Sequence, residues 1–249
     1  MPIMKIEELL ASRTDLSTFL VHLTRSSNGI SAKEILKTII SDEKLLAGAP
    51  YGIAAKLLGD KGKSTDSQKV VCFTETPMEH LSLLSSEIEN RSYKFEPYGL
   101  AFTRKQCRSK GVNAVWYIDI TPGHTWLTNP LNQLVENAIA TGDYDASAIS
   151  RISPFIEQMG VWAGDPGAGT PGYRKEFWWE REWRHVGDFD LPNTYMILCP
   201  TSDMKELKAF VDGLDDAVRP RVSFIDPFWS LESIIGKLAG FSATELGPF

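Results

Sequence analysis

The alternation of hydrophobic and polar positions predicts strands and helices in turn along the first half of the chain. Residues 17–25 form a short apolar, partly β-branched run that is typical of a strand. Ser31 and Glu34 form a capping box, and the apolar repeat behind them predicts a helix that ends before Gly48. The same arrangement recurs, with predicted strands at 69–74, 98–103 and 113–120, a helix capped by Thr76 with an apolar stripe of Leu81, Leu84 and Ile88, and a short polar helix at 104–111.

The second half predicts more helix and ends in a regular alternation. Residues 129–160 have a mostly helical pattern, and the glycines and prolines of 164–172 exclude regular structure there. Strands at 193–200 and 221–226 each precede a helix, the first capped by Asp203 and the second started by Asp226 and Pro227. We therefore predict an α+β fold with a mixed, split sheet flanked by helices, organised as a core over residues 1–192 and a βαβα extension over 193–249.

Composition and charge narrow the class of protein. With 249 residues, 43% hydrophobic and 23% charged, the chain has the composition of an ordinary globular protein. A net charge of -6 argues against a surface that binds nucleic acid over its whole extent. Cys72, Cys107 and Cys199 are far apart and in no metal or disulfide spacing. The first thirteen residues place acidic side chains inside their apolar pattern, so we expect neither a secretory signal nor a membrane span, but a cytoplasmic protein without a membrane partner.

The segment RKEFWWEREWRHVGDFD, residues 174–190, combines three tryptophans, three glutamates and three arginines. If it forms a strand, alternation places Glu180 and Glu182 on one face. If it forms a helix, Trp179 and Trp183 are neighbours at i, i+4. The strand is favoured, because aromatic enrichment and a short span bounded by glycines suit a strand better.

Two interpretations of this acidic pair stay open. In the first, Glu180 and Glu182 are solvated surface charges, and Arg184 is a simple partner for one of them. In the second, two carboxylates beside aromatic walls steady a positive charge that develops during a reaction. Breaking an N-glycosidic bond makes that demand, because the ribose passes through an oxocarbenium-like state.

The glycine-rich loop that runs into this E-x-E segment resembles the ADP-ribosyltransferases. The resemblance implies an ADP-ribosyltransferase-like fold and a reaction in which NAD is the substrate. It implies that Glu182 binds the nicotinamide ribose and stabilises its cation, while Glu180 positions the acceptor, a nucleic acid or a protein.

Two earlier segments fit the same resemblance. HLTR, residues 22–25, is similar to the H-x-T of some DNA-modifying members, and CFTE, residues 72–75, is similar to the middle strand of that fold. Alternation places His22 and Thr24 on one strand face, although a packed core role for His22 and a solvent-facing role for Arg25 stay open. The resemblance implies that NAD is bound by His22, Thr24, Arg25, Phe73 and Thr74.

A further resemblance covers most of the chain. HLT, VCFTETP, YGLAFTRKQCRSKGVNAVWYI and EREWR occur in an order similar to that of the AbiGi abortive-infection family. It implies a role in phage resistance, as the antitoxin of a toxin–antitoxin pair. The main expectation is an NAD-dependent ADP-ribosyltransferase acting as an antiphage toxin or effector, because two carboxylates behind a glycine-rich loop have no obvious use in an antidote. The alternative is a catalytically silent antitoxin that binds a cognate toxin.

Other kinds of catalytic or binding site have weaker support in the sequence. The spacings of a P-loop and of a GxGxxG dinucleotide motif are absent. Cys72 could pair with His80 or His185 as a nucleophile, but it lies in an apolar run, where thiols are usually inert. His80 and His124 match no metal spacing, so we expect no metal. The basic residues of 104–110 could touch a phosphate backbone or form a solvated helix face, and a nuclease or RNA-binding effector is a third, weaker option.

Overall fold

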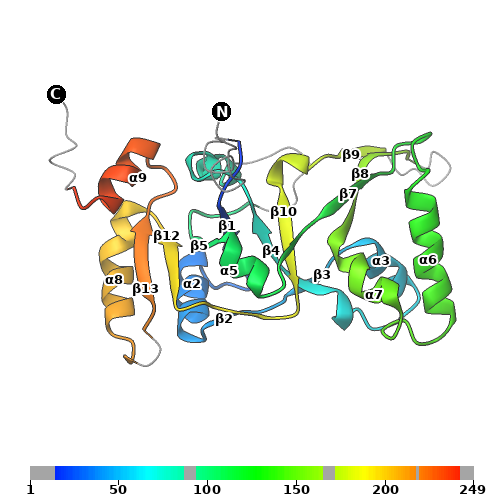
Figure 1. Ribbon diagram of the computed structural model, residues 1–249, viewed down its shortest axis with the longest axis horizontal. Helices are drawn as coiled ribbons and strands as arrows, with labels where there is room; N and C mark the ends of the chain where they lie inside the picture. Colours follow the sequence, from blue (N-terminus) through cyan, green and yellow to red (C-terminus); the bar gives the residue numbers. More distant parts are fainter. Residues whose placement is uncertain (1–14, 87–93, 165–171, 217–218, 242–249) are drawn as a thin grey trace, which may run out of the picture. The chain divides into compact units, whose positions relative to one another are not determined.

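The computed structural model describes residues 15–86, 94–164, 172–216 and 219–241. These residues form helices and several sheets with mixed strand directions, which confirms the predicted α+β class (Figure 1). The chain divides into two compact units and passes between them repeatedly. Unit 1 comprises residues 1–44, 75–107 and 190–249, and unit 2 comprises residues 45–74 and 108–189. Residues 193–249 thus belong to unit 1, and the predicted boundary at residue 192 stays a prediction.

Unit 1 contains a mixed sheet with strand order β13-β12-β5-β1. β12 is parallel to β13, whereas β5 is antiparallel to both of its neighbours. The first four residues of β5 are all buried, which is typical of a strand covered on both faces. The elements of this unit are β1 (Phe19–Leu23), α2 (Ala32–Ser41), η2 (Met78–His80), α4 (Leu81–Leu84), β5 (Gly99–Thr103), α5 (Arg104–Ser109, which ends in unit 2), β12 (Thr194–Leu198), η5 (Thr201–Asp203), α8 (Met204–Asp212), β13 (Arg221–Ile225) and α9 (Leu231–Leu238).

The first two predicted helix starts differ in outcome. α2 begins as predicted, because the Ser31 hydroxyl oxygen accepts the Glu34 backbone N–H at 3.2 Å. The predicted cap by Thr76 is wrong: after β4 (Lys69–Thr74) the chain enters the 3₁₀ turn η2, with Pro77 at the N-cap and no side-chain cap. Pro77 is extended there and has no N–H to donate. Ile88, predicted to continue this helix, lies outside the described residues.

The two C-terminal helices begin with different cap chemistry from that predicted. Asp203 holds the N-cap position of α8, but its carboxylate accepts from the Tyr98 hydroxyl at 2.6 Å and not from the helix. Ser230 is the N-cap of α9, and its hydroxyl oxygen accepts the Ser233 N–H, so the predicted start at Asp226 is four residues too early. The Asp226 carboxylate instead accepts the Phe228 N–H at 3.0 Å and closes a turn before the helix.

Unit 2 contains two sheets. β4 is antiparallel to β3 and to β10, and β10 is antiparallel to β6. In the second sheet, β8 is parallel to β7 and antiparallel to β9. α3 and α6 pack with Ile118 and Ile156 of the second sheet in one apolar core. The elements are β3 (Ala49–Pro50), α3 (Ile53–Asp60), η1 (Asp66–Gln68), β4 (Lys69–Thr74), β6 (Asn113–Ala114), β7 (Trp116–Asp119), α6 (Thr128–Ala140), α7 (Ala148–Ile152), η3 (Ser153–Phe155), β8 (Ile156–Trp162), β9 (Tyr173–Lys175), η4 (Trp178–Glu180) and β10 (Glu182–Val186); β2 (Lys44–Leu45) and β11 (Phe189–Asp190) lie where the chain changes units.

Two predicted elements of unit 2 are interrupted. The helical pattern over 129–160 is right for α6 and α7 but wrong from Ile156 onward, where β8 pairs in parallel with β7. Partner strands distant in sequence outweigh a local pattern there. The predicted strand over 113–120 divides into β6 and β7 at Val115, whose N–H donates to the Glu182 carbonyl at 2.9 Å. Most of the predicted loop, residues 165–171, lies outside the described residues.

Candidate functional site

The acidic segment does not form one continuous strand. Trp178–Glu180 is a 3₁₀ turn, Arg181 has a left-handed backbone with φ of 46°, and β10 begins only at Glu182. The Thr74 hydroxyl donates to the Glu180 carbonyl at 2.5 Å, which ties the turn to β4. A left-handed residue interrupts the alternation of side chains along a strand. The prediction that Glu180 and Glu182 share one strand face is therefore wrong.

Glu182 and Arg184, two residues apart on β10, form a bidentate ion pair. Arg184 Nε donates to Glu182 Oε1 and Arg184 Nη2 donates to Glu182 Oε2, both at 2.9 Å. The Arg184 side chain is only 1% exposed and the Glu182 side chain 15%. Both carboxylate oxygens of the predicted catalytic glutamate are thus engaged by a buried cation, and this parallel geometry is the strongest form of such a pair.

Further groups surround the same guanidinium. Arg184 Nη2 also donates to Glu157 Oε2, and Arg184 Nη1 donates to the Pro154 carbonyl, each at 2.6 Å. The guanidinium carbon lies 5.0 Å from the centroid of the Tyr51 ring, within cation–π range. Lys175 Nζ donates to Glu157 Oε1 at 2.5 Å. We call the four charged side chains, Lys175, Arg184, Glu157 and Glu182, the Arg184 cluster.

The Arg184 cluster combines two basic and two acidic side chains. Burial opposes the charge of Arg184, but Glu182 and Glu157 outweigh it and raise the pKa of the guanidinium. Burial likewise opposes the charge of Glu157, but Arg184 and Lys175 outweigh it and lower the pKa of that carboxyl. The buried Arg184 and the partly exposed Lys175 are thus matched by two carboxylates, which is how a folded protein can hold such charges largely away from water.

The surroundings of Cys72 on β4 disfavour the nucleophile considered from the sequence. Desolvation, followed by the nearby Glu182 carboxylate, raises the pKa of the Cys72 thiol well above its usual value. The thiolate is the nucleophilic form of cysteine. The raised pKa keeps the Cys72 thiol protonated at neutral pH, in a hydrogen bond with the Glu182 side chain.

We expect the stability of the protein to fall in acid because of Glu157. Its folded pKa lies below its ordinary value, so the folded state binds fewer protons than the unfolded chain as the pH falls. The contribution is complete above the unfolded pKa, about 4.3, and is lost as the pH falls through the folded value. Urea unfolding between pH 7 and pH 3 measures it, and Glu157→Gln should flatten the pH dependence below about pH 5. An unchanged acid slope in that variant would contradict this origin.

Gly52 permits the close approach that positions the Pro154 carbonyl. It has a φ of 90°, and a Cβ there would lie 2.0 Å from the Ser153 carbonyl oxygen and 2.8 Å from Pro154 Cα. Both partners are backbone atoms, so an added methyl group cannot be accommodated by a side-chain rotation. Tyr51, the residue before Gly52, places its ring against Arg184. The close contact of Gly52 with Ser153 and Pro154 therefore brings the Tyr51 ring and the Pro154 carbonyl to the same guanidinium.

Gly52→Ala should therefore lower the free energy of unfolding by about 2–3 kcal/mol, from backbone strain and displacement of the Pro154 segment. Gly59→Ala is the matched control, because Gly59 lies in α3 with no atom within 4 Å of an added Cβ. Removing a helical glycine should be neutral or stabilising, by up to about 1 kcal/mol. Denaturant unfolding of both variants checks the difference, and equal stabilities would show that the close contact costs nothing.

The predicted NAD-binding residues fall into two groups. His22, Thr24 and Arg25 lie in or just after β1 of unit 1. The Thr24 side chain is buried, and its hydroxyl donates to the Ala32 and Tyr98 carbonyls, both at 3.2 Å. This hydroxyl therefore holds the backbone after β1 together. Arg25 is exposed. The role of these three residues in NAD binding stays a prediction.

The second group lies beside the acidic segment. In the β4–β10 ladder, Thr74 is opposite Glu182 and Phe73 is opposite Trp183. Phe73 is 2% exposed and packs edge-on against Phe189, with 5.1 Å between ring centroids. The structure thus brings Thr74 and the two glutamates together in unit 2, whereas Phe73 is a core residue; NAD binding by either stays a prediction.

The sequence did not identify the partners that complete the Arg184 cluster. Glu157 lies inside a segment with a helical pattern, and Pro154 contributes only a backbone carbonyl, so neither gave a signal. The sequence indicated only that Arg184 could pair with one of the two glutamates, and the structure selects Glu182. A hollow of about 240 Å³ lies on unit 1, lined by residues of β1, β5, β12, β13 and α5, and it includes none of the predicted site residues.

The described residues contain neither a candidate metal site nor a helix suited to span a membrane. No group of three or more His, Cys, Asp and Glu side chains within those ranges is placed to hold a metal ion. In the same part of the chain, no helix has the length and apolar character needed to cross a membrane.

Comparison with known proteins gives one match. Residues 55–210 match the model of a family described as "Putative abortive phage resistance protein AbiGi, antitoxin". No curated protein and no solved structure matches the chain, and the likeness to the ADP-ribosyltransferase fold stays a prediction. The matched segment contains the whole Arg184 cluster and leaves out β1, β13 and α9. Because it spans more than half of the 249 residues, the chain belongs to the AbiGi abortive phage resistance family.

Proposed function

We propose that the protein is the antitoxin of a toxin–antitoxin pair in abortive phage resistance, and that it neutralises a cognate toxin by binding it. The family description supports this role. The observation that carries the proposal is the state of Glu182, whose two carboxylate oxygens are both paired with the buried Arg184. A carboxylate held in this way stabilises the fold of unit 2 and is costly to redirect toward a reacting ribose.

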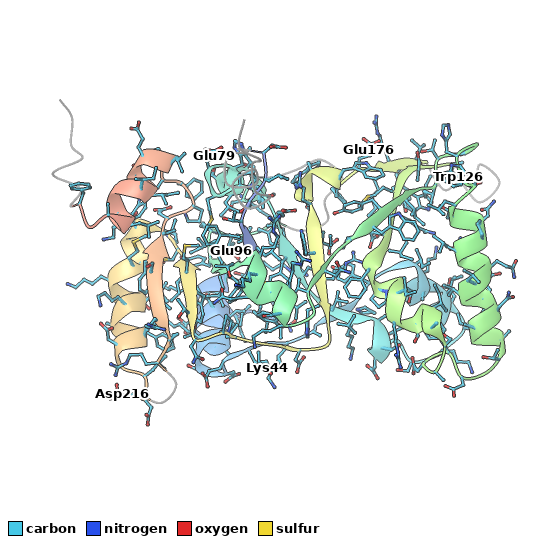
Figure 2. All side chains as sticks on the ribbon, viewed as in Figure 1. Lys44, Glu79, Glu96, Trp126, Glu176 and Asp216 are labelled. Atoms are coloured by element: carbon cyan, nitrogen blue, oxygen red, sulfur yellow. The ribbon has the colours of Figure 1, made fainter. Side chains whose placement is uncertain are left out.

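The surface proposed to bind the toxin consists of Tyr173, Trp178 and Trp179, which we call the aromatic strip. Their exposed fractions are 52%, 41% and 42%, high values for such large rings. Trp and Tyr are enriched among the residues that carry most of the binding energy of protein interfaces. Arg174 and Glu176, which form an exposed ion pair at 2.7 Å, supply a polar rim; Figure 2 labels Glu176 in this segment.

Two rings of the aromatic strip pack against other aromatic side chains. Tyr173 stacks on Trp162 with 4.9 Å between ring centroids and 6° between ring planes. This stack joins the last residue of β8 to the first residue of β9. Trp178 packs edge-on against Tyr117 at 5.3 Å. Side chains fixed before binding lose little entropy when a partner docks, so the strip is preorganised for an interface.

Expression in cells tests the proposal. The protein alone should leave growth unchanged, should restore growth when expressed with the toxin encoded beside it, and should copurify with that toxin. Growth arrest by the protein alone would contradict the antitoxin role and favour an effector.

An ADP-ribosyltransferase is the second candidate, and one observation favours it. Thr74, Glu180 and Glu182 are contiguous, since the Thr74 hydroxyl contacts the Glu180 carbonyl and Thr74 is the ladder partner of Glu182. Incubation of the wild-type protein with labelled NAD and cell extract tests it. Under the antitoxin proposal no macromolecule is labelled. Labelling that Glu182→Gln abolishes but Glu157→Gln retains would support the transferase, because both variants disturb the same cluster and only one removes the predicted catalytic carboxylate.

A further inference from the structure

The sheet of unit 1 is covered by helices over only part of one face. Residues paired across neighbouring strands point to the same side of a sheet, so their side chains form rows across it. The row that contains Leu23, Leu198 and Ile225 packs with α4 and α9 in one apolar core. Thr194 and Arg221, which are paired at the start of β12 and β13, are exposed instead. This end of the face is therefore accessible to a ligand.

The hollow of about 240 Å³ on unit 1 lies at this accessible end. Its lining includes Ala101 of β5, which is 1% exposed, and Met196 of β12, the ladder partner of Ala101. Phe19 of β1 and Arg221 of β13 line opposite ends, because β5 and β12 lie between these two strands. Neighbouring strands are about 4.8 Å apart, so three such spacings separate the ends by about 14 Å. These dimensions suit a small ligand that lies across the strands.

Three polar side chains at the β13 end of the hollow can donate hydrogen bonds to a ligand. Within the described ranges, the Arg221 side chain forms no ion pair, and the Thr194 and Ser223 hydroxyls have no hydrogen-bond partner. Arg221 is paired with Thr194, and Ser223 follows Arg221 by two residues on the same face of β13. No described Asp or Glu lines the hollow, although the chain contains 32 of them. A guanidinium and hydroxyls without a carboxylate beside them suit an anionic ligand.

Gln106 of α5 fixes one wall of the hollow. Its Oε1 accepts hydrogen bonds from the Thr103 N–H and the Thr103 hydroxyl, both at 2.9 Å. Its Nε2 donates to the Thr194 carbonyl at 3.1 Å. These bonds tie the end of β5 to the start of β12. A wall that is held in place before binding loses little entropy when a ligand enters.

We propose that this hollow binds a small aromatic acid. The carboxylate or phosphate oxygens of the ligand accept from the Arg221 guanidinium, in the bidentate geometry that arginine favours, and from the Thr194 hydroxyl. The ring lies over Ala101 and Met196 toward Phe19, where apolar surface is removed from water. The hollow lies on unit 1 and the aromatic strip on unit 2, so the inference goes beyond the antitoxin role, and either can fail without the other.

Methyl NMR of the full chain tests the proposal, with naphthoate as the probe. The protein carries methyl-labelled methionine, and Met196→Leu identifies the Met196 signal. Naphthoate should shift this signal, because its ring lies over the methyl group, with a dissociation constant on the order of 1 mM. Neutral naphthamide should bind at least about 10-fold more weakly, since it lacks the charge that Arg221 binds. The tighter binder of naphthoate and naphthyl phosphate identifies the acid as a carboxylate or a phosphate.

A pair of arginine variants tests the anion site itself. Arg221→Gln should raise the dissociation constant of naphthoate at least about 10-fold. Arg219→Gln is the matched control, because Arg219 pairs with Asp216 at 3.0 Å and does not line the hollow. Its affinity should stay within about twofold of the wild type. Equal thermal unfolding temperatures establish that both variants fold.

Four results would overturn the proposal. The first is a Met196 signal that does not move at about 20 mM naphthoate. The second is an Arg221→Gln protein that binds naphthoate as the wild type does. The third is naphthamide that binds as tightly as naphthoate, because the site then does not select an anion. The fourth is inorganic phosphate that binds as tightly as naphthyl phosphate, because the ring then contributes nothing.

Discussion

Replacing Arg184 by alanine is expected to lower the free energy of unfolding by about 3–5 kcal/mol. The side chain is 1% exposed and donates to Glu182, Glu157 and the Pro154 carbonyl. Its removal leaves the largely buried carboxylates of Glu157 and Glu182 with only Lys175 to compensate, and it opens a cavity beside Tyr51. Urea or thermal unfolding followed by circular dichroism measures the loss.

Arg174→Ala is the matched control for this prediction. Arg174 is 66% exposed and paired with Glu176 at the surface, so its removal should change stability by less than about 0.5 kcal/mol. A second comparison separates lost charge balance from lost volume. Arg184→Met combined with Glu157→Gln and Glu182→Gln removes the buried charges together and should be less destabilising than Arg184→Ala. If Arg184→Ala lowers the free energy of unfolding no more than Arg174→Ala does, the Arg184 cluster contributes little to folding.

Removing the two tryptophans of the aromatic strip should abolish most of the affinity for the toxin. Trp178→Ala with Trp179→Ala is expected to raise the dissociation constant by about 30-fold or more, since truncating one central interface tryptophan can cost about 2 kcal/mol. Both rings are about 40% exposed, so stability should change much less than affinity. Isothermal titration calorimetry with the purified toxin measures the effect, and restoration of growth in cells should fail in parallel.

Trp126→Ala is the control for the aromatic strip. Trp126 is 79% exposed on unit 2, outside the strip, and Figure 2 labels it near the start of α6. Its removal should leave toxin affinity within about twofold of the wild type. Unchanged affinity in the double variant would place the toxin elsewhere on the protein, while leaving the antitoxin role itself to the growth assay.

Periodicity and caps predicted much of the secondary structure, because those signals act over a few residues. The β-branched run at 69–74 is β4, the Ser31 cap begins α2, and the alternation of strand and helix after residue 192 appears as β12, α8, β13 and α9. In one segment, pairing with distant strands overrode the local pattern and the prediction was wrong. Ile156–Trp162 continues a helical pattern in sequence, yet pairing with β7 and β9 makes it a strand.

In the acidic segment, too, local features could be predicted from the sequence, whereas contacts with distant residues could not. The sequence by itself determined that carboxylates, a guanidinium and aromatic rings gather within residues 174–190, and that Glu182 and Arg184 are close enough to pair. Only the tertiary structure decided which oxygens are engaged and which rings are exposed. Arg181 adopts a left-handed backbone, Glu157 and Pro154 approach from β8 and η3, and Gly52 lets that segment come near. The physical reason is that a side chain's chemistry is local, whereas its burial and its partners are set by chain segments that only the packed fold brings together.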